Sequence, residues 1–213
     1  MSKPYPFLQS KEELPPTLPI FPLPGAVLLP RGHLPLNIFE PRYLNMVNDA
    51  MRSDRLIGMI QPIDESHTEL SKVGCAGRII RYEETRDGRI EILLAGLCRF
   101  AIKEELSSVR DYRLVQAEWA EYAADLESSS NVNADQALLF KGALRQYLQS
   151  EELELDHALL DKLHIEDLLN SMISYLPLDQ HSKQILLETT TLEDRVVSFI
   201  AILQNNNGEA LQH

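Results

Sequence analysis

Proline is distributed very unevenly along this chain, and that feature constrains the fold more than any other. All but one of the 12 prolines lie before residue 63, and the exception is Pro177. Proline cannot donate a backbone hydrogen bond and fits poorly inside helices and central strands. The first part of the chain is therefore expected to form short strands and turns. After residue 125 the apolar residues recur at helical spacing, with few glycines among them. The sequence thus predicts an α+β fold in which strands precede helices.

The first part carries the signals of six or seven short strands with one inserted helix. The proline-rich segment 18–30 predicts edge or kinked strands with a turn at Pro24 and Gly25. A strand is expected over 33–39, and a helix is expected to open at Pro41, where the missing N–H costs nothing. Further strands are expected over residues 56–60, 75–85, 89–94 and 112–119. This pattern predicts a closed or nearly closed antiparallel β-barrel.

Two glycines mark special backbone positions in the strand region. Asp87-Gly88 stands between two alternating runs and predicts a tight two-residue hairpin with positive φ at the turn. Gly96 interrupts the alternation of the return strand, which predicts a bulge or a barrel corner.

Capping signals and helical periodicity predict a bundle of helices in the second part. Capping boxes are expected at Asn133 and Thr190, and Asp179 is expected to cap a helix between them. Pro177 separates that helix from the preceding one. The predicted helices cover residues 133–148, 156–163, 165–175, 180–188 and 190–204, and the first has Leu138, Leu139, Leu144 and Leu148 as candidate core positions.

These patterns divide the chain into five parts. They are an N-terminal tail at 1–17, a β-barrel subdomain at 18–124, a Ser/Asn-rich linker at 125–132, a helical bundle at 133–206 and a disordered tail at 207–213.

The charge of the chain limits its partners. The formal net charge is −12, and most of the excess lies in residues 133–213. Nucleic acids are bound chiefly through Lys and Arg that displace counterions, and this sequence has no basic run. We therefore expect no nucleic-acid binding, whereas a negative surface favours basic partners.

The ends and the apolar stretches indicate the compartment. Residues 1–13 mix charges with prolines and contain no apolar signal segment, so we expect no export. The longest apolar stretches, 26–29 and 92–97, are far shorter than the about 20 residues of a membrane span. Cys75 and Cys98 are too few for a disulfide framework and are expected to be buried free thiols. We therefore expect a cytoplasmic protein that does not cross a membrane.

The histidines do not predict a metal site. His157, Asp161 and His164 lie at helical spacing, but no further ligand completes a zinc motif. His33 and His67 stand in loop-like contexts without a partner. Solvated or capping histidines are expected instead.

No pattern predicts nucleophilic catalysis. The pairs Ser71-Lys72 and Ser182-Lys183 are adjacent in sequence, so their side chains diverge on a strand or a helix and neither forms a dyad. No G-x-S-x-G elbow is present. The sequence leaves open the possibility of an active site assembled from residues far apart in the chain, because such sites are set by geometry.

The proline-rich opening has two interpretations. It could be a ligand for aromatic grooves, but Phe21, Leu23, Val27 and Leu28 are too apolar for a free tail and favour barrel strands.

The arginines around the predicted hairpin are interspersed with glutamates and are interpreted as a solvated charged face. These arginines are Arg78, Arg81, Arg86 and Arg89.

An ordered series of motifs resembles the N-terminal, substrate-binding domain of the Lon ATP-dependent protease. The first stretch is L-P-I-F-P-L-P-G-A-V-L-L-P at residues 18–30, followed by L-P-L-N-I-F-E-P-R-Y at 34–43. The last is L-P-L at 176–178, with K-Q-I-L-L-E at 183–188 and L-x-x-R at 192–195. Between them lie G-C-A-G-R-I at 74–79, D-G-R at 87–89 and G-L-C-R-F at 96–100. A series in this order is far more specific than any single motif.

The resemblance covers about residues 18–204 and implies a fold. It implies a pseudo-barrel of the kind seen in RNA-binding PUA modules, joined to a helical bundle. In the protease this domain is thought to help engage unfolded substrates and to assist assembly. The chain has no Gly-Lys dipeptide and therefore no Walker loop for ATP, and it ends before any proteolytic domain. We therefore expect a stand-alone form without ATPase and protease parts.

The expected function is non-catalytic binding of unfolded or extended polypeptide segments. The binding surface would be an apolar groove between barrel and bundle, or an exposed strand edge. The alternative is a regulatory or oligomerisation domain that acts with a separate protease, another partner chain or itself. RNA binding, by analogy of fold, comes third. No cofactor or metal is expected, and the sequence designates no peptide-binding residues, because exposure cannot be read from it.

Overall fold

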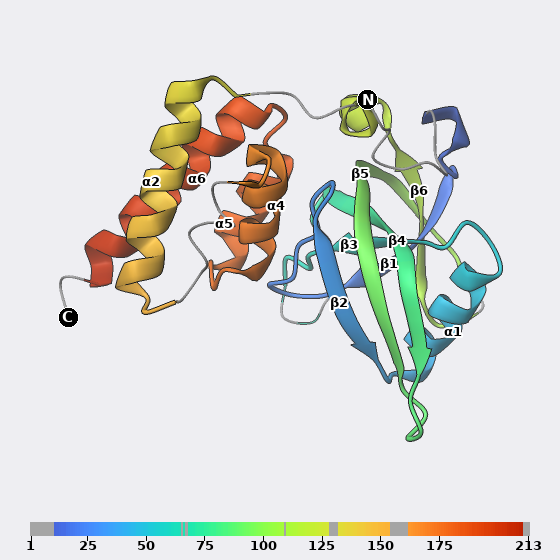
Figure 1. Ribbon diagram of the computed structural model, residues 1–213. Helices are drawn as coiled ribbons and strands as arrows, with labels where there is room; N and C mark the ends of the chain where they lie inside the picture. The colour runs from blue at the N-terminus through green and yellow to red at the C-terminus, as the bar shows by residue number, and fades with distance from the viewer. Residues whose placement is uncertain are drawn as a thin grey trace.

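The computed structural model describes residues 11–64, 66, 68–108, 110–127, 132–153 and 162–210. Its strands are β1 (Thr17–Pro22), β2 (His33–Ile38), β3 (Leu56–Ile60), β4 (Val73–Glu84), β5 (Ile90–Leu106) and β6 (Arg113–Glu118). Its helices are η1 (Lys11–Glu13), α1 (Pro41–Met51), η2 (Ala120–Leu126), α2 (Ala134–Ser150), α4 (Ile165–Tyr175), α5 (Gln180–Glu188) and α6 (Leu192–Ala210). The strands form one side of the molecule, and helices α2, α4, α5 and α6 form the other (Figure 1). The expected α+β order is confirmed.

The six strands form one sheet that closes on itself. The strand order is β2-β5-β4-β3-β1-β6, and β5 pairs with β6 as well. The long strand β5 makes this possible, because its first half pairs with β2 and its second half pairs with β6, while β4 runs along most of it. Five strands therefore form a ring, and β2 extends the sheet as a free edge strand.

Strand β1 corrects two expectations. It lies between β3 and β6 rather than at an edge, and it runs parallel to β3, so the sheet is mixed rather than antiparallel. The two pairings hardly overlap: β6 pairs with Thr17 to Ile20, and β3 pairs with Ile20 to Pro22. Because only Ile20 has a partner on both sides, prolines at 19 and 22 fit inside the sheet, where two full ladders would exclude them.

The hairpin between β4 and β5 is longer by one residue than expected. Thr85 N–H donates to the Arg89 carbonyl at 2.9 Å, and Gly88 N–H donates to the Thr85 carbonyl at 3.1 Å. The loop is therefore Arg86-Asp87-Gly88. Within this loop only Gly88 has a positive φ, of +86°, whereas a two-residue type I′ turn requires positive φ at both central positions. A three-residue loop ending in a left-handed glycine satisfies the same sequence.

The bulge expected near Gly96 is confirmed. Ala76 pairs with Cys98 and Gly77 pairs with Gly96, so Leu97 is the extra residue on β5. Gly96 also lies against the chain that leads into β2, because its N–H donates to the Gly32 carbonyl and its own carbonyl accepts from Arg31, both at 2.8 Å. The bulge in β5 therefore lies where the backbone of Arg31 and Gly32 contacts the ring.

The buried apolar residues form two clusters. One fills the ring and takes Leu18, Phe100 and Val115 from three of its strands. The other is continuous from the outer face of the sheet, under α1, into the layer of helices. Phe21 and Leu28 of the proline-rich opening belong to it and are buried, as expected of barrel residues. The strand and helix parts therefore share this second cluster.

Helix α2 buries two of the four expected core residues, Leu144 and Leu148, and exposes the other two. Phe140, Leu144, Tyr147 and Leu148 are buried, in a pattern of i, i+4, i+7 and i+8 that faces α6. Two of the expected core residues lie off this stripe, and they are largely exposed: Leu138 is 70% exposed and Leu139 is 65% exposed.

The caps of the later helices follow the sequence with one shift. Asn133 caps α2 and Asp179 caps α5, each by accepting a backbone N–H, as expected. The cap of α6 is Thr191 rather than Thr190, because Thr191 Oγ1 accepts from Asp194 N–H at 3.1 Å. The helix continues to Ala210, past the point where fraying was expected. The helix expected over 156–163 lies almost wholly outside the described residues.

Two residues near the expected boundaries are buried. Leu14, in the expected tail, packs into the ring core, next to the bond from Trp119 Nε1 to the Pro15 carbonyl at 3.0 Å. Asp125, in the expected linker, belongs to η2. Among the described residues, none of the helices combines the length and apolar character needed to cross a bilayer.

Candidate functional site

Gln61 fastens the strand ring to helix α5. Its side chain is fully buried just after β3. The Gln61 Nε2 group donates to the Gln180 carbonyl at 3.1 Å and to Gln184 Oε1 at 3.0 Å, and Gln61 Oε1 accepts from Gly25 N–H at 3.2 Å. A buried carboxamide is stable only with its partners in place, so Gln61 fixes the distance between the two parts.

A groove opens at this joint. It has a volume of about 860 Å³ and runs between α5 on one side and the ring, with η2, on the other. The lining is a mixture of apolar side chains, carboxamides and a few charges. It consists of Gln61, Pro62, Ile63, Ser71, Lys72, Val73, Ala101, Glu121, Tyr122, Gln180, His181, Gln184 and Glu188.

The amide groups of the lining already have partners within the fold. Gln184 Nε2 donates to the Val73 carbonyl at 3.1 Å and to Glu188 Oε1 at 2.7 Å. Gln180 Nε2 donates to the Pro62 carbonyl at 2.5 Å. Because these amide groups already have hydrogen-bond partners, a peptide in the groove would contact its floor mainly through apolar interactions and complementary shape.

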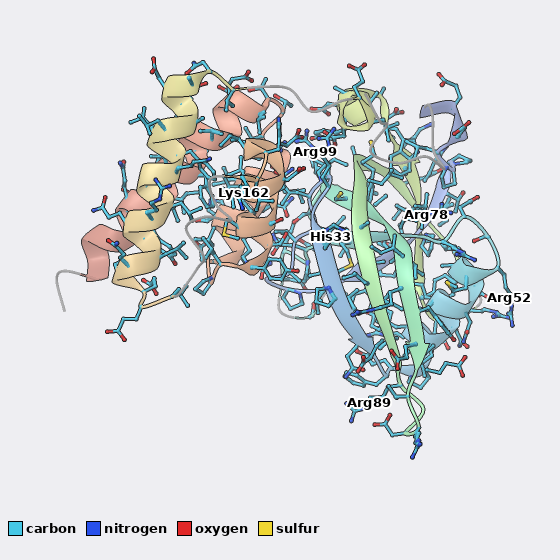
Figure 2. All side chains as sticks on the ribbon, in the orientation of Figure 1. His33, Arg52, Arg78, Arg89, Arg99 and Lys162 are labelled. Carbon is cyan, nitrogen blue, oxygen red and sulfur yellow. The ribbon has the colours of Figure 1, made fainter. Side chains whose placement is uncertain are left out.

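A buried ionic cluster lies behind the groove. Arg99 from β5 makes two bonds to Asp125, and its Nη1 donates to the carbonyls of Leu187 at 3.1 Å and Thr189 at 2.6 Å, at the end of α5. Its guanidinium also stacks on Tyr122, 4.5 Å from the ring centre. Figure 2 shows Arg99 where the strands meet the helices. One side chain therefore joins β5, η2 and the end of α5.

A second arginine extends the cluster into the helices. Arg195 donates to Leu186 O at 3.2 Å, Asn170 Oδ1 at 3.2 Å and Thr189 O at 2.9 Å. Burial, together with the charge of Arg99, lowers the pKa of Arg195 to about 10. The group stays charged at neutral pH and acts as a structural donor.

A short ion pair lies at the edge of the ionic cluster. Arg31 Nη1 lies 2.5 Å from Glu166 Oε1, and both side chains are about nine-tenths buried. Burial nevertheless raises the pKa of Glu166, and the opposing effect of Arg31 is smaller. The ionised pair therefore exists at a desolvation cost.

The described histidines form no metal site. His164 is the N-cap residue of α4, and His33 is exposed on β2. His157, Asp161 and His67 lie outside the described residues. Within the described part of the chain, no three His, Cys, Asp or Glu side chains stand close enough together to hold a metal ion.

The two Ser-Lys pairs lie at different places along the joint. Ser71 and Lys72 line the groove. Lys183 Nζ donates to the Gly25 carbonyl at 3.0 Å, and burial lowers its pKa. Ser182 N–H donates to the Asp179 cap at 2.9 Å. Lys183 therefore contributes a second tie between α5 and the ring.

The cysteines match their expected role, and the hairpin arginines match theirs only in part. Cys75 and Cys98 are free and buried, and burial raises the pKa of both thiols. Arg78 donates to the Asp54 carbonyl at 3.0 Å, and Arg89 pairs with Asp87 at 3.0 Å on the surface. Figure 2 places these two arginines at separate parts of the sheet, so they form no single patch.

The groove residues escaped sequence reasoning because the fold brings them together from distant segments. Gln61 and Gln184 are 123 residues apart in the chain. One signal was present: Gln180, Gln184 and Glu188 recur every four residues and so share one face of a short helix. That polar stripe marks the face of α5 that meets the ring.

A closed strand ring and a layer of helices, tied by buried polar groups and with a groove at the joint, define a two-part α+β module. Residues 17–205 match the family described as the ATP-dependent protease La (LON) substrate-binding domain. The chain belongs to that family.

Curated relatives are Lon proteases. The chain is 27% identical over 219 residues to Lon protease 2 of Myxococcus xanthus, which covers 97% of this chain and 26% of the relative. It is 34% identical over 103 residues to the Lon protease of Flavobacterium johnsoniae, covering 46% of this chain and 13% of the relative. The chain thus spans about a quarter or less of the length of these relatives.

Solved structures share the fold. A Lon N-terminal domain protein from Xanthomonas campestris has a TM-score of 0.66 at 24% identity, over 87% of this chain and 97% of the other. The N-terminal domain of the Lon protease of the Mycobacterium avium complex has a TM-score of 0.67 at 16% identity, over 88% and 98%. At these identities the likeness shows the fold alone.

Proposed function

We propose that this chain is a recognition module that binds extended, partly apolar polypeptide segments in the groove between the strand ring and α5. The observation that carries the proposal is the groove itself. It is open, its amides are satisfied internally, and apolar side chains such as Ile63, Val73 and Tyr122 line it. Such a surface suits a chain that brings apolar side chains.

Membership of the substrate-binding family supports the same function. The family is described as the substrate-binding domain of a protease. Satisfied carboxamides with apolar contacts discriminate little between the side chains of a bound segment. We propose that the module performs no chemistry itself. The carboxamides of the joint are engaged in structural bonds, and the nearby arginines face carbonyls and carboxylates of the fold.

The test compares two exposed isoleucines. Ile63 lines the groove and is 64% exposed, and Ile80 lies on β4, outside the groove lining, and is 52% exposed. Binding of a labelled, unstructured, leucine-containing peptide is measured by fluorescence anisotropy for the wild type, Ile63→Asp and Ile80→Asp. We expect Ile63→Asp to weaken binding about tenfold, because a buried apolar contact of about 1.5 kcal/mol is lost. Ile80→Asp should bind like the wild type.

Equal loss in both variants, or none in either, would contradict the groove as the binding site. Absence of any peptide binding by the wild type would contradict the function. Thermal unfolding of both variants checks that neither substitution acts through stability.

Self-association or docking on a partner chain is the second candidate, and the exposed leucines of α2 favour it. Leu138 and Leu139 are adjacent, exposed and apolar, and such pairs occur at helix–helix contacts. Sedimentation of the wild type and of Leu138→Glu tests it. A concentration-dependent dimer that the substitution abolishes would support a regulatory or oligomerisation role.

Three finer descriptions belong to the same proposal. We interpret the ring as a PUA-like pseudo-barrel joined to a helical bundle, on the strength of the β5–β6 closure. RNA binding stays third, because the net charge is −12. A cytoplasmic location is supported by the two free cysteines.

A further inference from the structure

The groove has different chemistry at its two ends. Helix α5 forms one wall, and the groove residues His181 and Glu188 lie near its opposite ends. Seven helical steps separate them, so this wall is about 10 Å long. A wall of that length faces about three residues of an extended chain. An occupant can therefore meet both ends at once.

One end is acidic. Glu121 of η2 and Glu188 of α5 both line the groove and are exposed. The two carboxylates flank Tyr122: burial is the main cause of its raised pKa, and the charges of both glutamates add to it. Arg99, the cation close to Tyr122, is buried and its charge is already matched by Asp125. The carboxylates at this end therefore face the groove with little compensation.

The other end carries the exposed apolar side chain of Ile63 and the basic side chain of Lys72. Ile63, Ser71 and Lys72 line both this groove and an adjoining hollow of about 380 Å³. These shared residues mark where the two hollows meet. Glu121 and Glu188 line only the first hollow, so they lie away from the junction. Lys72 therefore shares this junction with Ile63.

The geometry points to a substrate class for this groove: extended segments with an apolar side chain against Ile63 and, about three residues away, a lysine or arginine against Glu121 and Glu188. This inference rests on the proposed peptide binding and adds the charge preference and the residues that set it. Complementary charge at the open end of a groove selects between partners more than it adds affinity. The net charge of −12 favours the same class of partner at longer range.

The experiment uses three labelled peptides with one apolar segment in common. The segment is followed by two arginines, two glutamines or two glutamates, and anisotropy is measured at low and at high salt. With the wild type we expect the arginine peptide to bind about fivefold more tightly than the glutamine peptide at low salt, the effect of one or two exposed ion pairs. The glutamate peptide should bind more weakly than both. High salt should remove these differences and leave binding of the glutamine peptide nearly unchanged.

A charge-matched pair of double variants locates the preference. Glu121→Gln with Glu188→Gln removes the two groove carboxylates and keeps an acceptor for the Gln184 side chain. Glu83→Gln with Glu91→Gln removes two exposed carboxylates that face each other across the hairpin. The first variant should bind all three peptides alike, and the second should keep the wild-type order.

The outcomes separate the two proposals. Equal loss of preference in both double variants would show a net-charge effect and overturn the assignment to Glu121 and Glu188. Equal affinity of the wild type for the three peptides would overturn the charge preference, but it would not contradict the proposed peptide binding. Failure of the glutamine peptide to bind at any salt would overturn the proposed function, and with it this inference.

Discussion

Arg99 and Asp125 meet through two parallel hydrogen bonds inside the joint between the strand ring and the helices. Arg99 Nε lies 2.9 Å from Asp125 Oδ2, and Arg99 Nη2 lies 2.8 Å from Asp125 Oδ1. The Arg99 backbone N–H donates to the same carboxylate at 3.0 Å. Both side chains are less than one-tenth exposed. This bidentate contact joins β5 to η2. The Nη1 group of Arg99 also donates to carbonyls at the end of α5.

Removal of this arginine should strongly destabilise the fold. Arg99→Met leaves the Asp125 carboxylate and the Thr189 carbonyl buried without their main donor. We expect a loss of about 3–5 kcal/mol in the free energy of unfolding, measured by urea denaturation. The double variant Arg99→Met with Asp125→Leu should lose less than the single variant, because no uncompensated charge remains.

The control is a pair at the surface. Arg89 and Asp87 lie 3.0 Å apart on the hairpin and are at least half exposed. Arg89→Met should cost less than about 1 kcal/mol. Equal losses for Arg89→Met and Arg99→Met would contradict a special role for the buried pair.

Gly96 should be intolerant of any side chain. A Cβ at this position would lie 1.9 Å from the Leu29 carbonyl oxygen and 2.8 Å from its carbon. These are backbone atoms held by the bonds to Gly32 and Arg31, so they cannot move aside cheaply. We expect Gly96→Ala to lower the free energy of unfolding by on the order of 3 kcal/mol.

Gly142 supplies the opposite case for the same substitution. It lies inside α2, and a Cβ there would meet no heavy atom within 4 Å outside its own helix. Gly142→Ala should stabilise the protein by about 0.5–1 kcal/mol, since alanine is the better helix former. Thermal unfolding of both variants checks the contrast, and a shift in the same direction would refute it.

The sequence predicted the fold well where the signals were local. The Pro41 helix start, the β3 strand and the Asn133 and Asp179 caps each depend on a few neighbouring residues, and each is present. The central, parallel position of β1 could not be predicted in the same way. This position depends on β1 pairing with β6 over its first half and with β3 over its second half. The residues of β1 alone do not specify these partners.

The site was less accessible to sequence reasoning than the fold. A groove lies between the two parts as expected, but its walls come from the segment after β3, from β4 and β5, and from η2 and α5. Leu138 and Leu139 were assigned to the core because apolar side chains usually pack, and only the contact between α2 and α6 decides which face does so. Gln61 carries no local signal at all, because its partners are all distant in sequence, and Gln180 and Gln184 lie more than 100 residues away.

Glu166 should make stability depend on pH in a direction unusual for a salt-bridged carboxylate. Burial raises its pKa above the ordinary value, so the folded state binds this proton more tightly than the unfolded state. Its contribution to stability is therefore fully present below the unfolded pKa and is lost as pH rises through the raised value. Urea unfolding of the wild type and of Glu166→Gln is compared from acid to neutral pH.

We expect the wild type to lose stability relative to Glu166→Gln over this range. An opposite trend would mean that the attraction of Arg31 outweighs burial. The Arg31→Met variant serves as the control, because loss of the partner charge should raise the pKa of Glu166 further and steepen the dependence.

Cys75 and Cys98 should be unreactive in the folded protein. Both are fully buried, and burial raises the pKa of both thiols, so the nucleophilic thiolate is scarce and inaccessible. We expect no reaction with Ellman's reagent under native conditions and reaction of both thiols in denaturant. Asn45→Cys, at an exposed position of α1, should add one rapidly reacting thiol and so prove that the assay detects surface cysteines. Rapid native reaction of the wild type would show instead that the ring around Cys98 opens readily.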